Sequence, residues 1–188
     1  NGTIGFQVEN AMASIASAWA LNVEWDVILQ GVSTFVNDAQ TAPGRFNFFE
    51  YRGASVIADY GHNPDAIVAL VSAIENIPAK KRMVVISGAG DRRDIDISRQ
   101  SEILGDAFDE VILYEDQCQR GRADGEVLAL LRRGLANASR TKKVDEIRGE
   151  FVAIDAALSR LEKDDLCLIL IDQVDEALAY ISQRISQA

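Results

Sequence analysis

The residues best suited to do chemistry stand in one short segment, residues 59–66, which reads DYGHNPDA. It contains the only histidine of the chain, His62, three residues after Asp59. Two acids, an aromatic residue, a glycine and a lone histidine at the end of an apolar run could form the edge of an active site. The same segment also offers Asn63, a good helix N-cap, and then Pro64, a good first helical residue. These residues alone leave an active site and a plain strand-to-helix turn equally open.

Two further segments carry groups of the kind that bind polar ligands. Residues 87–94 read SGAGDRRD, and residues 115–126 read EDQCQRGRADGE. Glycine lets the backbone approach a ligand, and arginine binds phosphate or carboxylate through two parallel hydrogen bonds. Aspartate can bind magnesium, a ribose hydroxyl or a cationic substrate. GAGDRRD lacks the third glycine of a dinucleotide-binding fingerprint, and each segment also fits a solvated, charged turn.

Several kinds of chemistry are excluded by the residues present. None of the 188 residues forms a Walker-type loop, so the chain cannot cradle the phosphates of ATP in that way. One histidine and two cysteines, Cys118 and Cys167, support neither a zinc site nor a disulfide framework, and we predict no metal ligand. Cys167 lies in the apolar run DLCLILI and is expected to be an inert core residue.

The composition is that of a globular domain, with 48% apolar and 26% charged residues. The formal net charge of −10 argues against binding to a nucleic-acid backbone or an anionic membrane. No segment has the length of a membrane span, and we expect a reducing, cytoplasmic setting. The chain opens with NGTIGFQVEN rather than with Met, which reads as the interior of a longer protein.

The chemistry-bearing segments must be positioned by the elements around them. Two helices are expected first, at residues 8–22 and 25–35, and turn formers at 37–44 indicate a domain boundary. A β-hairpin with its turn at Gly53 follows. Strands and helices then alternate: helix 64–77, strand 82–88, helix 98–108, strand 110–115, helix 125–136, strand 143–148, helix 150–161, strand 165–171 and helix 175–185.

This alternation predicts an α/β fold, a Rossmann-like and mostly parallel sheet with helices on both faces and one antiparallel edge strand. The strand RMVVISG is almost wholly apolar, as a sheet covered on both faces requires. Ligands of open parallel sheets bind at the carboxyl ends of the strands. The three polar segments, and DQVDEA at residues 172–177, each follow a strand. We therefore expect them to meet at one edge of the sheet.

Read in chain order, five stretches form a series that resembles the C-terminal part of the Mur ligases. They are FQVENAMASIASAWAL, PGRFNFFE, DYGHNPDA, GAGDRRD and YEDQCQRGRADGE. The alanine-rich helix, the Pro-Gly-Arg turn and the DYGHNPDA loop are shared widely across that family, and in part with folylpolyglutamate synthases. The GDRRD and RGRADGE stretches are similar to its cyanophycin synthetase branch. Gln7, Glu9 and Gly61 depart from the pattern of many Mur ligases.

The resemblance implies a division of the chain and an activity. Residues 1–40 would be the helical tail of the Mur central ATPase domain, and residues 41–188 the Mur C-terminal domain. The full protein would be an ATP-dependent ligase that uses Mg²⁺ and adds arginine to the aspartate side chains of cyanophycin through an acyl phosphate. ATP and Mg²⁺ would be held mainly by the upstream part, so this piece alone is expected to be inactive.

The resemblance also implies partners and site residues. The partners would be a cyanophycin primer, arginine, aspartate, the ATP-grasp and central domains of the same chain, and further copies in a homo-oligomer, with no nucleic acid and no membrane. Asp59 and His62 would be catalytic and would face ATP and the reacting groups. Contacts to the nucleotide would come from Asn10, Arg45 and Asn63. Residues beside the incoming arginine would be Asp91, Arg92, Arg93, Asp116 and Arg120.

Two other functions fit the same residues. The chain could come from another Mur-type ligase, of the peptidoglycan or folate branch, with a different incoming amino acid. It could also be a non-catalytic Mur-like domain kept for polymer binding or assembly. An upstream ATP-grasp domain would favour cyanophycin synthesis, whereas a missing upstream phosphate-loop lysine would favour the non-catalytic alternative.

Overall fold

Six strands form one sheet in the computed structural model, which describes residues 4–115 and 119–187. Their order across the sheet is β1-β2-β6-β3-β4-β5. The first pair is antiparallel and every other neighbouring pair is parallel, which confirms the predicted fold and its antiparallel edge. The strands are β1 Asn47–Tyr51, β2 Ala54–Asp59, β3 Arg82–Ile86, β4 Glu110–Glu115, β5 Lys143–Arg148 and β6 Leu166–Leu170.

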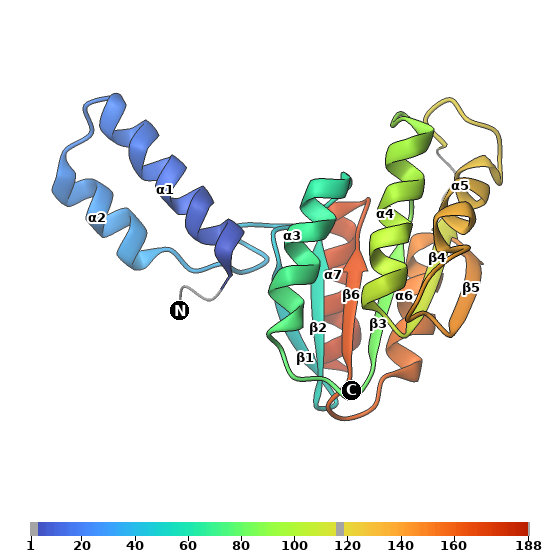
Figure 1. Ribbon diagram of the computed structural model, residues 1–188. Coiled ribbons are helices and arrows are strands. Elements are labelled where there is room, and N and C mark those ends of the chain that lie inside the picture. The colour runs from blue at the N-terminus through green and yellow to red at the C-terminus, as the bar shows by residue number, and fades with distance from the viewer. Residues whose placement is uncertain (1–3, 116–118, 188) are drawn as a thin grey trace.

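Helices cover both faces of this sheet (Figure 1). One face carries α3 Pro64–Glu75, α4 Asp94–Ala107 and α5 Glu126–Leu135, and the other carries α6 Glu150–Arg160 and α7 Val174–Ser186. Successive strand residues point to opposite faces, so the core divides in two. Ile57 and Val84 pack with Leu104 of α4 in one cluster, while Val56 and Ile154 belong to the other. A sheet covered in this way needs strands that are apolar on both faces, as β6 is.

The boundaries of the elements follow local chemistry. Arg52 and Gly53 have positive φ angles of 52° and 79°, as both central residues of a tight hairpin turn of type I′ require. The turn predicted at Gly53 is therefore confirmed. Helix α4 begins at Asp94, before the predicted start at residue 98. The extra turn has little apolar periodicity, but Asp94 and Asp96 lie where the helix dipole stabilises carboxylates.

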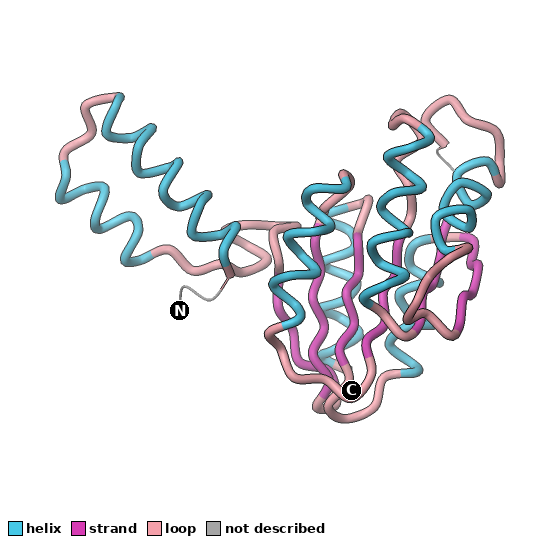
Figure 2. The backbone as a smooth tube through the Cα atoms, viewed as in Figure 1, coloured by secondary structure: helices cyan, strands magenta, loops and turns pink. Residues whose placement is uncertain are grey.

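The first two helices, α1 Gly5–Ala20 and α2 Trp25–Thr34, pack on each other and project away from the sheet (Figure 2). The start of α1 reaches the core, where the rings of Phe6 and Phe46 meet edge-on with centroids 5.9 Å apart. Farther along, α1 is largely exposed, with Trp19 at 70%. Within the described residues, no helix has both the length and the apolarity to cross a bilayer.

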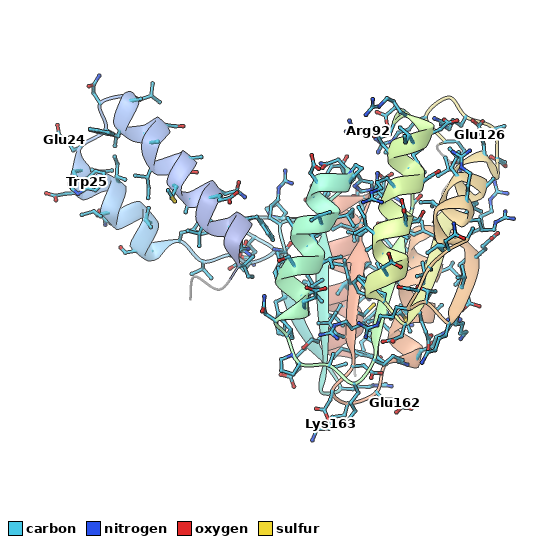
Figure 3. All side chains as sticks on the ribbon, in the orientation of Figure 1. Glu24, Trp25, Arg92, Glu126, Glu162 and Lys163 are labelled. Carbon is cyan, nitrogen blue, oxygen red and sulfur yellow. The ribbon has the colours of Figure 1, made fainter. Side chains whose placement is uncertain are left out.

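The connections define one special place at the carboxyl edge of the sheet. Strands β2 and β3 lead into helices on one face, whereas β6, which lies between them, leads into α7 on the other face. Open α/β sheets bind ligands beside such a topological switch point. Figure 3 shows Arg92 and Glu126 at this carboxyl edge, and Glu162 and Lys163 at the opposite edge.

Candidate functional site

Asp59 ends β2 and anchors the loop that follows. Its side chain is buried, with one oxygen accepting from the backbone N–H of Phe46 at 2.7 Å and the other from that of Gly61 at 2.6 Å. Burial raises the pKa of the carboxyl, although these two hydrogen bonds and the charge of Arg45 oppose the rise. Phe46 has a φ of 53°, an unfavourable value for a bulky residue. Asp59 thus fixes the backbone on both sides of the site.

The Pro-Gly-Arg turn lies directly against this loop. Tyr60 donates its N–H to the carbonyl of Gly44 at 2.9 Å, and the N–H of Gly44 is bound by Asn47 Oδ1 at 2.7 Å. Arg45 is exposed, and no carboxylate of the described residues lies within 4 Å of its guanidinium. The turn therefore presents an unpaired cation next to DYGHNPDA, a suitable arrangement for an anionic ligand.

His62 is a buried imidazole with one nitrogen engaged and one directed outward. Its side chain is 5% exposed, its ring packs on Tyr60, and Nδ1 lies 2.7 Å from the Tyr60 carbonyl oxygen. Because a carbonyl only accepts, Nδ1 carries the proton in the neutral ring and Nε2 is an acceptor. Burial lowers the pKa of His62, while the Tyr60 carbonyl and Asp172 oppose the decrease. Nε2 faces Asp172 Oδ1 at 3.9 Å.

Asp172 is a site residue that sequence reasoning missed. It follows β6, and Glu150 at the start of α6 holds this loop by accepting the N–H groups of Asp172 at 2.8 Å and Gln173 at 3.1 Å. The segment DQVDEA was recognised as a strand-end loop, but no residue in it was selected. The strand order supplies the missing information, because it places β6 directly beside β2.

Arg120 joins these residues to the loop after β3. Its Nη2 donates to Asp172 Oδ1 at 2.6 Å, and its Nη1 lies 3.6 Å from Asp91 Oδ1. Burial lowers the pKa of Arg120, whereas the Tyr60 side chain and the nearby carboxylates raise it. The raising effects are larger together, so the pKa lies above its ordinary value. The structure thus brings together His62 and two of the residues predicted beside the incoming amino acid, Asp91 and Arg120.

Arg122, which was not selected from the sequence, clamps the loops after β3 and β4. It donates to the carbonyls of Gly90 at 2.6 Å and Arg92 at 2.7 Å, and pairs with Glu126 at 2.7 Å. The loops approach so closely that a Cβ added at Gly90 would stand 2.1 Å from the Gln119 carbonyl oxygen. Arg120 and Arg122 stand on either side of Gly121 in the sequence. Their different roles can therefore be recognised only from their contacts in the structure.

Asn63 and Arg93, two more of the predicted site residues, lie outside this network. Asn63 caps α3 by accepting the N–H of Ala66 at 2.8 Å, and Arg93 pairs with Asp96 at 2.8 Å. Both line a shallow hollow of about 790 Å³ between α3 and α4. Arg92 is exposed at the start of α4.

Asn10 and Asp116 are two further residues predicted to belong to the site. Asn10 is exposed on the projecting helix α1, and its carbonyl accepts from Ser14 at 2.9 Å. Asp116 lies outside the described residues. Cys167 is fully buried, and burial raises the pKa of its thiol to about 12, in agreement with an inert core residue. Within the described ranges, no group of three or more His, Cys, Asp or Glu residues is arranged to hold a metal ion.

The fold and the strand-end loops define a doubly wound α/β domain whose polar loops meet at its switch point. Residues 44–170 match the family profile described as Mur ligase, glutamate ligase domain, and the chain belongs to the Mur ligase family. Solved structures agree in fold: Escherichia coli FolC with ADP superposes with a TM-score of 0.70 at 23% identity, covering 95% of this chain and 39% of that one.

The curated relatives show where in the family the similarity is high. Cyanophycin synthetase of Synechocystis is 33% identical over 183 residues, which is 97% of this chain and 21% of that protein. A UDP-N-acetylmuramoyl-L-alanyl-D-glutamate–2,6-diaminopimelate ligase of Alkaliphilus metalliredigens is 32% identical over 165 residues, 87% of this chain and 32% of that one. The chain spans about a fifth of the length of the cyanophycin synthetases it matches.

Proposed function

We propose that this chain is the C-terminal part of an ATP-dependent ligase that adds arginine to the aspartate side chains of cyanophycin. One observation carries the proposal: the similarity to cyanophycin synthetases extends over 97% of the chain, including the loops at the switch point. Residues 1–40 would belong to the central domain, and residues 41–188 would form the C-terminal domain.

The chemistry of amide formation explains what the strand-end loops must do. A carboxylate is a poor acyl donor, so ATP first converts it to an acyl phosphate and ADP leaves. The amine of arginine then attacks the carbonyl carbon, the amide bond forms and inorganic phosphate leaves. Positioning and electrostatics account for most of such a reaction. ATP and Mg²⁺ would be held mainly by the rest of the enzyme. This chain would contribute the unpaired guanidinium of Arg45 to the nucleotide phosphates or ribose, with Asn10 near the adenine and Asn63 assisting.

The geometry refines the roles proposed for the DYGHNPDA loop. Both oxygens of Asp59 are occupied by backbone N–H groups, so Asp59 would act by holding Gly61 and the loop in place. His62 would present its acceptor Nε2 to the incoming arginine when the domains close. Asp91, Arg92, Arg93 and Arg120 would stand beside the incoming arginine.

The direct test uses the full-length protein with ATP, Mg²⁺ and an Asp–Arg polymer primer. Incorporation of labelled arginine and of labelled aspartate is measured separately. We expect His62→Ala to lower arginine incorporation by about 100-fold, in the range of a lost acid–base or polar catalytic group, and to leave aspartate incorporation intact. Arg140→Ala is the control, because Arg140 is a partly buried arginine that pairs with Asp109 at the opposite sheet edge. Arginine incorporation that is unchanged in His62→Ala would contradict the proposal.

A second candidate activity has a specific observation in its favour, because the diaminopimelate ligase is 32% identical over 165 residues. The full-length protein would then add diaminopimelate to UDP-N-acetylmuramoyl-L-alanyl-D-glutamate. The same assay with labelled diaminopimelate and that acceptor distinguishes the two activities, since each predicts incorporation of one amino acid and not of the other.

A further inference from the structure

The groups that converge at the switch point are mostly hydrogen-bond acceptors. The carboxylates of Asp91 and Asp172 come from the loops after β3 and β6, and both face one guanidinium, that of Arg120. The Tyr60 side chain interacts with the same guanidinium and helps to raise its pKa. Four separate loops thus supply one cation and the groups around it.

A second observation points to a ligand at this place. The His62 ring is 95% removed from solvent, yet its Nε2 has no hydrogen-bond partner among the described residues, because Asp172 Oδ1 at 3.9 Å is too far. Nε2 is not among the fully enclosed polar atoms that lack a partner in the described residues, so it is the part of the ring that an entering group can reach. In the neutral ring Nε2 is an acceptor, so a donor that enters beside Asp172 would complete it.

The lining therefore selects the chemical class of the ligand. Two carboxylates and an imidazole acceptor repel a carboxylate or a phosphate. A guanidinium is the complementary group, since it is planar, always charged and carries five N–H donors and no acceptor.

Resting on the proposed function, we propose that Asp91, Asp172 and the Nε2 of His62 form the binding site for the guanidinium of the incoming arginine, and that Arg120 occupies this site as an internal placeholder. The amino acid displaces Arg120 when it binds. Asp172 is the central residue, because its Oδ1 faces both Arg120 and His62.

Arg120 is attached in a way that allows it to leave. The side chains of Arg120, Asp172 and Asp91 are 32%, 25% and 54% exposed, and ion pairs with such access to water contribute little to stability. Gly121, with a φ of 93° and open space around it, follows directly. Arg122 holds the base of the loop on Gly90, so the exchange moves a side chain and not the whole loop.

The first experiment replaces the carboxylates in the full-length protein. We expect Asp172→Asn and Asp91→Asn to raise the KM for arginine by about 10- to 100-fold, the range for a lost hydrogen bond to a charged group, with a smaller change in kcat. The preference for arginine over citrulline, its neutral isostere, should fall in parallel. Asp109→Asn is the matched control, because Asp109 pairs with Arg140 at 3.0 Å with a similar exposure of 23% at the opposite sheet edge. An unchanged KM and an unchanged preference in both variants would overturn the proposal.

The second experiment separates a placeholder from a substrate-binding arginine. Arg120→Ala frees the two carboxylates, so the KM for arginine should fall or stay the same, while Arg140→Ala should have no effect. A rise of tenfold or more in Arg120→Ala would show that Arg120 itself binds the substrate, and would overturn the proposal.

Equilibrium binding measurements test the guanidinium site without any turnover, so their outcome does not depend on the proposed function. Arginine and citrulline are titrated calorimetrically into the full-length protein and into Asp172→Asn, which needs no turnover. Tighter binding of arginine by the wild type alone supports the guanidinium site. Equal binding of the two ligands overturns it, even if the protein incorporates arginine. Arginine binding without incorporation would contradict the proposed function and not the site.

Discussion

At the scale of single residues, the switch point is defined by what each polar group is already bound to. Asp59 has both oxygens engaged, whereas His62 has one nitrogen engaged and one facing Asp172. The two residues looked equivalent in the sequence as candidate catalytic groups. Their contacts assign Asp59 to holding the backbone and leave His62 as the group with an available acceptor.

The single histidine makes its titration directly observable. Burial lowers the pKa of His62 below the ordinary value of 6.5, so the unfolded chain binds this proton at a higher pH than the folded chain. The contribution of the His62 shift to the free energy of unfolding is therefore fully present above about pH 6.5. It is lost as the pH falls from there through the pKa of His62 in the folded protein. We expect the imidazole NMR signals to titrate below 6.5. The free energy of unfolding should also decrease from pH 7 to pH 5, and less so in His62→Gln. Equal slopes in the two proteins would contradict this assignment.

Gly90 tests how closely the loops after β3 and β4 must approach. In Gly90→Ala the new Cβ meets the Gln119 carbonyl oxygen, which belongs to backbone and cannot turn aside. We expect a loss of about 1–3 kcal/mol in the free energy of unfolding, as for other overpacked positions. Denaturant titration measures it.

Gly31→Ala is the contrasting substitution. Gly31 lies within α2 with open space around it, so alanine should stabilise the helix by about 0.5–1 kcal/mol. If Gly90→Ala proves as harmless as Gly31→Ala, the close approach of the two loops is not required.

At the scale of elements, the helical pair α1–α2 is nearly independent of the sheet. Its contact with the core is made by the first turn of α1 through Ile4 and Phe6, and the helices beyond it expose large apolar side chains such as Met12 and Trp25. A chain lacking residues 1–36 should therefore still fold. We expect it to unfold cooperatively with a loss of about 1–2 kcal/mol, the worth of a half-buried phenylalanine, and to aggregate less.

Phe6→Ala in the complete 188-residue chain should reproduce most of that loss, because Phe6 carries the contact with Phe46. Denaturant titration and light scattering measure stability and aggregation. Failure of the shortened chain to show a cooperative transition would mean that the helical pair belongs to the folding unit of the sheet.

Most elements could be predicted from the sequence because their signals are local. The apolar runs of β3, β4 and β6 and the periodic face of α3 need no tertiary information. The start of α4 could not be found, since Asp94–Ile97 is helical mainly through charge at its N-terminus. Asp172 could not be found either. Its acidic segment looks like an ordinary helix start, and its role depends on strand order, which pairs β6 with β2 across most of the chain.

At the scale of the whole molecule, the net negative charge of the chain does not determine which charges gather at the switch point. The net charge of −10 is a sum over the surface, while Arg45, Arg120 and Arg122 gather at the carboxyl edge of the sheet. The sequence could exclude an extended basic surface. It could not show that Arg120 and Arg122 are each paired with two carboxylates, while Arg45 has none within 4 Å among the described residues.

The position of β6 has a consequence for how the protein is made. This strand is the last of the six to leave the ribosome, and it is inserted between β2 and β3, pairing Leu166 with both Ser55 and Arg82. Until it arrives, two apolar strands have unpaired inner edges, the state most prone to wrong association. The sheet of the nascent chain therefore stays incomplete until β6 has been synthesised. A chain released from the ribosome before residue 166 would expose these edges and become a substrate for chaperones and proteases.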